Sequence, residues 1–269
     1  MKIHATPIDC LVDEPVTIRL SGLPPARTVT VRAGVIDDFR HRWESHAEFV
    51  TDSAGSIALA ERAPRSGTYE GVDPMGLFWS MELEPSVSER HRFTKAGADP
   101  DRVRLVAELD GHEVASTELI RRYLLPTLVG VDVRHAGLVG TLFHRPGERR
   151  PALISLTGSG GGEAKEHAAL LASHGFTCLS LAYFNAAGLP PALWEIPLEY
   201  FQTAIAWLSE QDSVLPGAIG VTGISKGGEL SLLLGATFPE IRAVVARVPS
   251  SVVWTGIGPG HRRGSAACC

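Results

Sequence analysis

The tightest constraint on this chain is the stretch Gly223–Leu230, which reads GISKGGEL and places the pattern G-x-S-x-G around Ser225. A strand-like apolar run, AIGVT, precedes it, and an apolar helix-like run follows it. The glycines on either side of the serine leave room for a sharp strand-to-helix turn, where larger side chains would clash with neighbouring backbone. Such a turn exposes the serine hydroxyl, as a serine nucleophile requires.

Around this turn, from about Pro126 onward, apolar strand-like runs alternate with helix-like runs. The strand-like runs are VGVDVR, LVGTLFHR, ALISLTG, FTCLSLAYF, AIGVTGIS and IRAVVARVP, and the helix-like runs are EAKEHAALLASHG, PLEYFQTAIAWLSEQ and KGGELSLLLGATF. The first two strands straddle Ala136-Gly137 and predict a hairpin. Uniformly apolar strands joined by helices predict a parallel sheet that is covered on both faces.

The first part of the chain has a different pattern, in which short strand-like runs are separated by turn residues. PVTIRLSGL, TVTVRAGVID and WESHAEFVTD come first, and VRLVAEL and HEVASTELI flank Asp110-Gly111, a strong hairpin signal. With no long amphipathic helix, this half predicts an all-β sandwich of about seven strands. We therefore expect a sandwich over 1–126 and a second domain over 127–269, with an unstructured tail at 261–269.

The composition is that of an ordinary globular protein. The 269 residues carry a net charge of -5 and are 44% hydrophobic, which suffices for two modest domains. No basic face predicts a nucleic-acid partner, and no apolar run approaches the ~20 residues of a membrane span. The N-terminus lacks a signal-peptide core, so cytoplasmic residence is expected. The spacing of the cysteines (Cys10, Cys178, Cys268 and Cys269) favours neither a metal site nor a disulfide framework, and no cofactor is expected.

A serine that accepts an acyl group also needs donors for the developing oxyanion. The amide of Lys226, the residue after the serine, points toward that oxygen, and the start of the helix adds its dipole. The second donor is expected from the glycine-rich loop 157–162, TGSGGG, where Gly160 and Gly161 are equally good candidates. A phosphate-binding loop is less consistent with this stretch, because no Gly-Lys-Ser/Thr follows it and G-x-G-x-x-G spacing is absent.

Several longer stretches carry a resemblance to a known family. GISKGGEL, LTGSGGG, LSLAYFN and LPPALWEIPLEYF, together with GVDPMGLFWSM and WESHAEFVTDSAGS, resemble the type I acyl-CoA thioesterases, which share a family with the bile acid-CoA:amino acid N-acyltransferases. The resemblance runs from about residue 5 to about residue 259. It implies an immunoglobulin-like sandwich joined to an α/β-hydrolase domain, with acyl-CoA as substrate.

The same resemblance implies that the acyl group passes to the nucleophile and then to water or to an amino acid. The related acyltransferases carry cysteine at the nucleophile position, so Ser225 favours hydrolysis. In α/β-hydrolases an acid and then a histidine follow the serine. Here only Glu229, Glu240 and His261 follow it. We therefore expect a family member that is incomplete at its C-terminus and has low or no activity.

None of these three residues is in the expected place. Glu229 lies along the helix, where an ion pair with Lys226 is its expected role, and Glu240 precedes a strand, at the opposite end of the sheet. His261 could serve as a replacement base, although nothing in the sequence positions it. An upstream histidine, His167, is expected at the surface or near a helix cap. The leading hypothesis is a thioesterase; the alternatives are an N-acyltransferase and a non-catalytic module that binds acyl-CoA or a partner.

Three further residues are candidates for contact with a substrate. Asn185 follows a strand at its carboxyl end, where open α/β sheets bind ligands. Trp194 and Tyr200 flank a segment over the same end and could line an acyl pocket, but core packing explains them equally well. The sequence does not indicate the acyl chain length or the oligomeric state.

Overall fold

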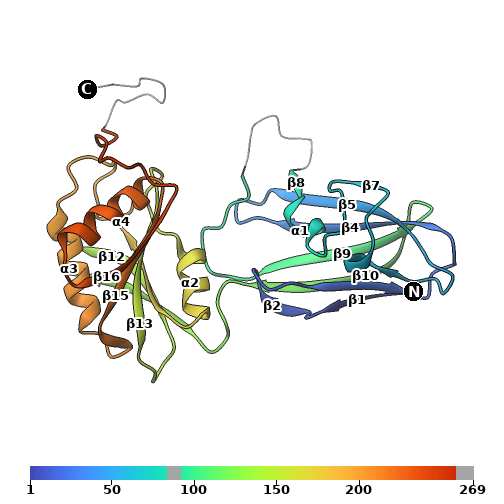
Figure 1. Cartoon of the computed structure of the whole chain (residues 1–269), viewed down its shortest axis with the longest axis horizontal. Coiled ribbons are helices and arrows are strands. Elements are labelled where there is room, and N and C mark those ends of the chain that lie inside the picture. The colour runs from blue at the N-terminus through green and yellow to red at the C-terminus, as the bar shows by residue number, and fades with distance from the viewer. Residues whose placement is uncertain (84–91, 259–269) are drawn as a thin grey trace. The chain divides into compact units, whose positions relative to one another are not determined.

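The computed structural model describes residues 1–83 and 92–258 and divides the chain into two compact units (Figure 1). The first unit is Met1–Tyr123, and the second begins at Leu124. His261 and the rest of the predicted tail 261–269, with its two cysteines, lie outside the described residues.

The first unit is built from short and long strands with one short helix. Its elements are β1 (Lys2–Thr6), β2 (Asp9–Leu11), β3 (Thr17–Ser21), β4 (Thr28–Ile36), β5 (Arg42–Val50), β6 (Ile57–Ala58), the 3-10 turn η1 (Leu59–Glu61), β7 (Ser66–Gly67), α1 (Gly76–Trp79), β8 (Glu82–Leu83), β9 (Asp101–Leu109) and β10 (His112–Arg122).

These strands form two sheets around one core. A three-stranded sheet has the order β1-β3-β6, and a larger sheet has the order β2-β10-β9-β4-β5-β7, with β8 also paired to β5. Alternate residues of both sheets point inward, among them Ile18 and Leu20 from one sheet and Val31 and Leu105 from the other. The described residues of this unit therefore form two sheets around one core, with more strands than the sequence indicated. The predicted immunoglobulin-like sandwich stays a prediction.

Local turn chemistry explains the hairpin between β9 and β10. Leu109 pairs with His112 in an antiparallel register, and Asp110 and Gly111 both have positive φ, 54° and 78°. Two consecutive residues with positive φ are the requirement of a tight two-residue hairpin turn.

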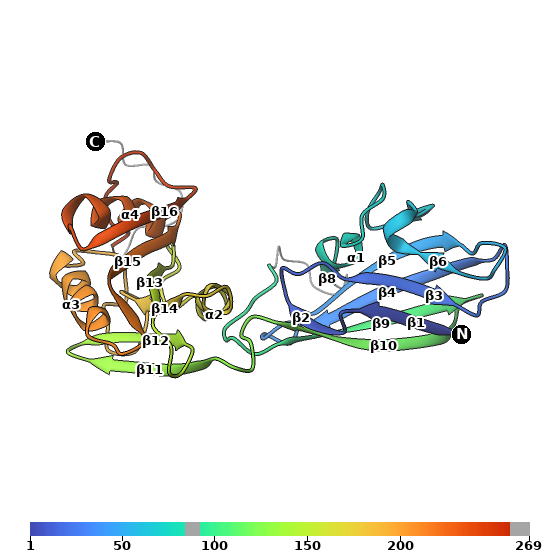
Figure 2. The same ribbon diagram turned by 60° about the horizontal axis from the view of Figure 1, so that its bottom comes forward.

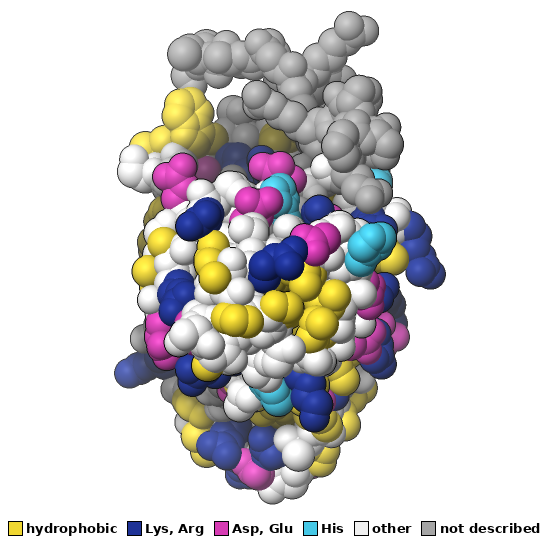
Figure 3. All heavy atoms as spheres, turned by 90° about the vertical axis from the view of Figure 1, so that its right-hand side faces the viewer, with side chains coloured by type: hydrophobic (Ala, Val, Ile, Leu, Met, Phe, Trp, Pro, Cys, Tyr) yellow, Lys and Arg dark blue, Asp and Glu magenta, His cyan; other side chains and the backbone are white. Residues whose placement is uncertain are grey.

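On the face of the molecule that Figure 3 shows, acidic, basic and apolar side chains are interspersed.

The second unit alternates strands and helices, as the sequence predicts. Its elements are β11 (Val129–His135), β12 (Leu138–His144), β13 (Arg150–Leu156), α2 (Lys165–Ser173), β14 (Thr177–Ala182), α3 (Leu198–Ser209), β15 (Val214–Ile224), α4 (Lys226–Thr237) and β16 (Ile241–Arg247). The sheet order is β11-β12-β14-β13-β15-β16. β11 and β12 form the predicted antiparallel hairpin, and β14, β13, β15 and β16 run parallel.

Helices lie on both sides of this sheet, with α2 on one face and α3 and α4 on the other (Figures 1 and 2). β14 is buried at every residue, and β12 is buried at every residue but its last. The two edge strands, β11 and β16, are mostly exposed, which corrects the expectation that both faces are covered throughout. Among the described strands β16 pairs only with β15, and its Val244 and Val245 are 36% and 56% exposed. Its apolar residues therefore face solvent at the edge of the sheet.

Two further observations concern the whole described chain. Cys10 and Cys178 are both buried and unbridged. Among the helices of the described residues, none has the length and apolarity that crossing a membrane would need.

Candidate active site

Ser225 lies in a sharp turn between β15 and α4. It is the N-cap residue of α4, is exposed, and has φ 56° and ψ -118°. Positive φ at a residue other than glycine is strained and persists where the surroundings hold it in place. The strand-to-helix turn predicted around the G-x-S-x-G pattern is therefore present, with the strain located at the serine itself.

The glycines around Ser225 are required by close backbone approach. A Cβ atom at Gly223 would lie 2.2 Å from the carbonyl oxygen of Gly227, and one at Gly227 would lie 2.2 Å from the carbonyl oxygen of Thr157. A Cβ at Gly228 would lie 3.0 Å from the carbonyl oxygen of Arg247. The start of α4 is thus packed against β13, β15 and the end of β16 at a distance that only glycine permits.

Backbone hydrogen bonds hold the serine on both sides. The Ser225 amide donates to the carbonyl of Arg247 at 2.9 Å, and the Ser225 carbonyl accepts from the amide of Glu229 at 3.0 Å. Lys226 is the first residue of α4, where backbone amides have no acceptor within the helix. This position agrees with the oxyanion role predicted for its amide, which stays a prediction.

The side chains of Lys226 and Glu229 form the predicted ion pair. The Lys226 ammonium lies 3.0 Å from Glu229 Oε1 and also donates to the Trp254 carbonyl at 3.1 Å. Glu229 is only 7% exposed, so it is not a charge on an open helix face. Its carboxylate accepts a second bond from the Trp254 amide at 3.0 Å. Both charges are therefore used in holding the segment around Trp254.

The glycine-rich loop approaches Ser225 at its first glycine, Gly158. A Cβ at Gly158 would lie 3.3 Å from Ser225 Cβ and 3.8 Å from its hydroxyl oxygen, whereas a Cβ at Gly160 would have no neighbour within 4 Å. The amide of Gly161 already donates to the Gly158 carbonyl at 3.2 Å. The amide of Gly161 is thus engaged inside the loop, while the role of Gly160 stays a prediction. Sequence reasoning missed Gly158.

Asn185 supports this loop. Its side-chain amide donates to the Gly160 carbonyl at 2.8 Å, and its backbone amide donates to the Pro190 carbonyl at 2.7 Å. The residue has φ 51°, in the left-handed region that asparagine tolerates better than most residues. In this structure Asn185 supports the glycine-rich loop through its bond to Gly160, and its predicted contact with substrate stays a prediction.

His167 lies in the first turn of α2, which agrees with the expected cap region, but it is half-buried and not at the open surface. It lies on α2 with Nδ1 3.2 Å from the Ser155 hydroxyl. Burial, and secondarily the positive charge of Arg247, lowers the pKa of His167 to about 4. In residues 1–83 and 92–258, no histidine or carboxylate hydrogen-bonds to the hydroxyl of Ser225.

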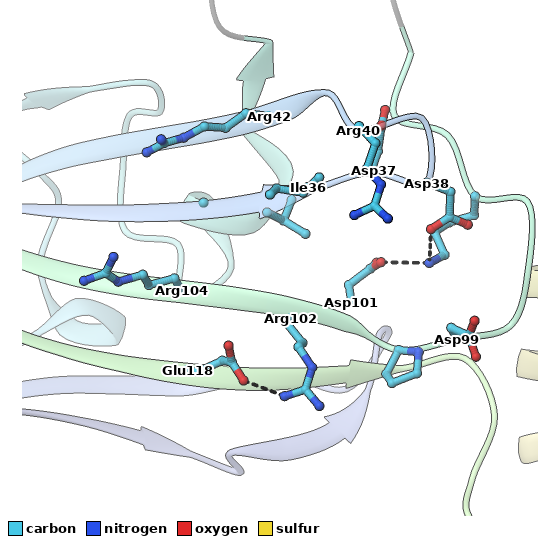
Figure 4. Close-up of a pocket in the computed structure, with 14 residues that line it drawn as sticks. Ile36, Asp37, Asp38, Arg40, Arg42, Asp99, Asp101, Arg102, Arg104 and Glu118 are labelled. Carbon is cyan, nitrogen blue, oxygen red and sulfur yellow. Dashed lines mark hydrogen bonds and ion pairs between the residues drawn. The ribbon is translucent and has the colours of Figure 1, made fainter.

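A cavity lies on the first unit (Figure 4). It measures about 630 Å³, and charged side chains line it. Several of these neutralise one another, since Lys95 pairs with Asp38 and Asp101, and Arg102 pairs with Glu118. None of its lining residues belongs to the turn around the serine.

A second cavity, of about 220 Å³, lies beside the turn between β15 and α4. Lys226 and Glu229 line it, and so does Trp194, one of the two aromatic residues expected at an acyl pocket. Tyr200, the other aromatic residue, does not line this cavity. Its hydroxyl donates to the Ala182 carbonyl at 2.6 Å, inside the second unit. Within the part of the chain that the structure describes, no group of three or more His, Cys, Asp or Glu side chains is placed to hold a metal ion.

A mainly parallel sheet flanked by helices, with a serine in a strained strand-to-helix turn beside a glycine-rich loop, defines an α/β-hydrolase-type domain. Residues 13–135 match the N-terminal region of the acyl-CoA thioester hydrolase/BAAT family, and residues 196–258 match the C-terminal region of the same family. The chain belongs to this family, and the resemblance predicted from the sequence is confirmed.

Individual relatives agree with this assignment. Acyl-coenzyme A amino acid N-acyltransferase 1 of Mus musculus is 36% identical over 91% of this chain and 61% of its own length. Acyl-coenzyme A thioesterase 1 of Homo sapiens is 36% identical over 88% of this chain and 57% of its own length. The chain thus spans less than two thirds of the length of these relatives.

Solved structures are similar only in part. The α/β hydrolase GrgF from Penicillium has a TM-score of 0.39 and 25% identity, covering 46% of each chain. An esterase of Pyrobaculum calidifontis has a TM-score of 0.36 and 20% identity, covering 46% of each chain.

Proposed function

We propose that this chain carries the acyl-accepting serine of an acyl-CoA thioesterase-type hydrolase. The observation that carries the proposal is Ser225, held at φ 56° with the glycine-rich loop packed against it. Membership of the family supports acyl-CoA as the substrate class, because several relatives are named acyl-coenzyme A thioesterases.

The proposed reaction has two steps. The hydroxyl oxygen of Ser225 attacks the thioester carbonyl carbon, an O–C bond forms, the C–S bond breaks, and CoA leaves as a thiolate that receives the hydroxyl proton. The amides of Lys226 and of the glycine-rich loop stabilise the oxyanion of the intermediate. Water then attacks the acyl-serine ester, which releases a carboxylic acid and restores the hydroxyl.

In the part of the chain that the structure describes, no histidine or carboxylate hydrogen-bonds to the Ser225 hydroxyl as a general base would. Without one, the serine stays a neutral hydroxyl and only the oxyanion site promotes the reaction. We therefore expect the 269-residue polypeptide to form and hydrolyse acyl-serine slowly, at a rate well below that of a thioesterase with a complete Ser-acid-His triad.

The test is an acylation assay. The polypeptide is incubated with an acyl-CoA, free CoA is followed with a thiol reagent, and the acyl adduct is located by mass spectrometry. An adduct on Ser225 that is absent from Ser225→Ala supports the proposal. CoA release at the same rate in both proteins would contradict it.

A second candidate is transfer of the acyl group to an amino acid. Two relatives of similar identity, 36% and 35%, are named N-acyltransferases. The assay with glycine or taurine added separates the two functions, because only the acyltransferase gives an amide product. Acyl-CoA binding without turnover, undiminished in Ser225→Ala, would instead favour a non-catalytic binding module.

A further inference from the structure

The 220 Å³ cavity beside the nucleophile turn has an apolar interior. Leu230 and Leu233 of α4 line it together with Phe201 of α3. Phe201 is fully buried and closes the floor, while Trp194 and Trp254, 46% and 54% exposed, stand at the rim. The cavity is therefore shaped to take an apolar group that enters from solvent.

One corner of the cavity is polar and begins at Lys226, the residue that follows Ser225 in the chain. Lys226 and Glu229 line this corner, one turn before the two leucines on the same face of α4. Their charges are already paired with each other and with the backbone of Trp254. The corner therefore offers no free charge to a ligand, and recognition inside the cavity rests on apolar contact.

Hydrogen bonds hold the wall of the cavity opposite α4 at two points. The Lys226–Glu229 pair holds the backbone of Trp254, and the amide of Ile257 donates to the Leu193 carbonyl at 2.6 Å. A Cβ at Gly256 would lie 2.3 Å from that same Leu193 carbonyl, so the segment lies directly on it. The cavity therefore has a defined width.

We propose that this cavity receives the acyl chain of the substrate and limits it to medium length; this inference rests on the proposed function. A methylene group fills about the volume of a water molecule, ~30 Å³, so about 220 Å³ holds roughly seven. With the carbonyl carbon at Ser225, the cavity is filled by an acyl chain of about eight carbons. Longer chains extend past the rim tryptophans and gain little further contact.

The test measures binding without turnover, in a Ser225→Ala background. Dissociation constants are determined by calorimetry for straight-chain acyl-CoAs from acetyl to palmitoyl. Affinity is expected to rise by up to about fourfold per methylene and to level off near eight carbons. Quenching of tryptophan fluorescence by a brominated acyl chain locates the ligand beside the rim.

A matched pair of variants tests whether Leu233 limits the length of the bound acyl chain. Leu233→Ala removes three carbon atoms from the cavity and is expected to move the plateau to chains about three carbons longer. The adjacent Leu232, which is 44% exposed and does not line the cavity, supplies the control Leu232→Ala, which leaves the plateau in place.

The outcomes separate this inference from the proposed function. A plateau that moves in Leu233→Ala and not in Leu232→Ala supports the acyl cavity, even if Ser225 is never acylated. Affinity that climbs steadily to palmitoyl, or a plateau unaffected by Leu233→Ala, overturns it, even if Ser225 does become acylated.

Discussion

Gly227→Ala is the sharpest test of the proposed packing at the nucleophile. The added Cβ would lie 2.2 Å from the Thr157 carbonyl oxygen and 2.8 Å from that of Leu156. Both contacts are to backbone at the end of β13, which cannot rotate away as a side chain would. Overpacking costs about 1–3 kcal/mol, and two fixed contacts place this variant near 3 kcal/mol. For a protein of this size that corresponds to a melting temperature lower by roughly 6–12 °C.

The matched control is Gly160→Ala in the facing loop. A Cβ there has no neighbour within 4 Å and the residue is outside the left-handed region, so its stability is expected to change by at most about 1 kcal/mol. Scanning calorimetry of the whole chain compares both with the wild type. The steric argument is wrong if Gly227→Ala has the same melting temperature as the wild type, or if Gly160→Ala loses as much stability as Gly227→Ala.

Three further predictions follow from other contacts. The folded chain holds the pKa of His167 at about 4, below its ordinary 6.5, so the unfolded chain binds the proton first as the pH falls. The free energy of unfolding should therefore decrease by up to about 3 kcal/mol as the pH drops from 6.5 toward 4. Urea titrations at several pH values should show that the free energy of unfolding depends less on pH in His167→Gln, and as in the wild type in the exposed His112→Gln. Asn185→Gly keeps the backbone conformation but removes the hydrogen bond to the glycine-rich loop, costing about 1 kcal/mol and slowing acylation of the nucleophile, as mass spectrometry would show. Val245→Lys, on the exposed edge strand, should reduce self-association in sedimentation, whereas Val72→Lys, at the same 56% exposure in the other unit, should not.

The fold of the second unit was largely predictable because its elements are long and periodic. The runs FTCLSLAYF and KGGELSLLLGATF became β14 and α4 with ends shifted by only a few residues. The short strands of the first unit were not predictable. Ile57–Ala58 and Ser66–Gly67 are too short to show the alternation of a strand, and only pairing with β3 and β5 defines them.

The features of the candidate site likewise divide into those that the sequence predicts and those that it does not. The strand-to-helix turn at Ser225 was predictable because the need for glycine on both sides is a local steric requirement. The contact made by Gly158 was not, because it depends on how the loop folds, with the Gly161 amide turned back to the Gly158 carbonyl. The environment of His167 was also hidden, since Arg247, which helps to lower its pKa, is far away in the sequence.

The strained serine and the exposed edge strand are linked by one residue. Backbone strain of this kind costs about 1–3 kcal/mol and must be opposed by fixed contacts. One of these contacts is the bond from the Ser225 amide to the carbonyl of Arg247, the last residue of β16, against which Gly228 also packs. Because β16 pairs only with β15 among the described strands, fraying of β16 would remove a support of Ser225. Pairing along the outer edge of β16 therefore bears on the geometry of Ser225 as well as on solubility.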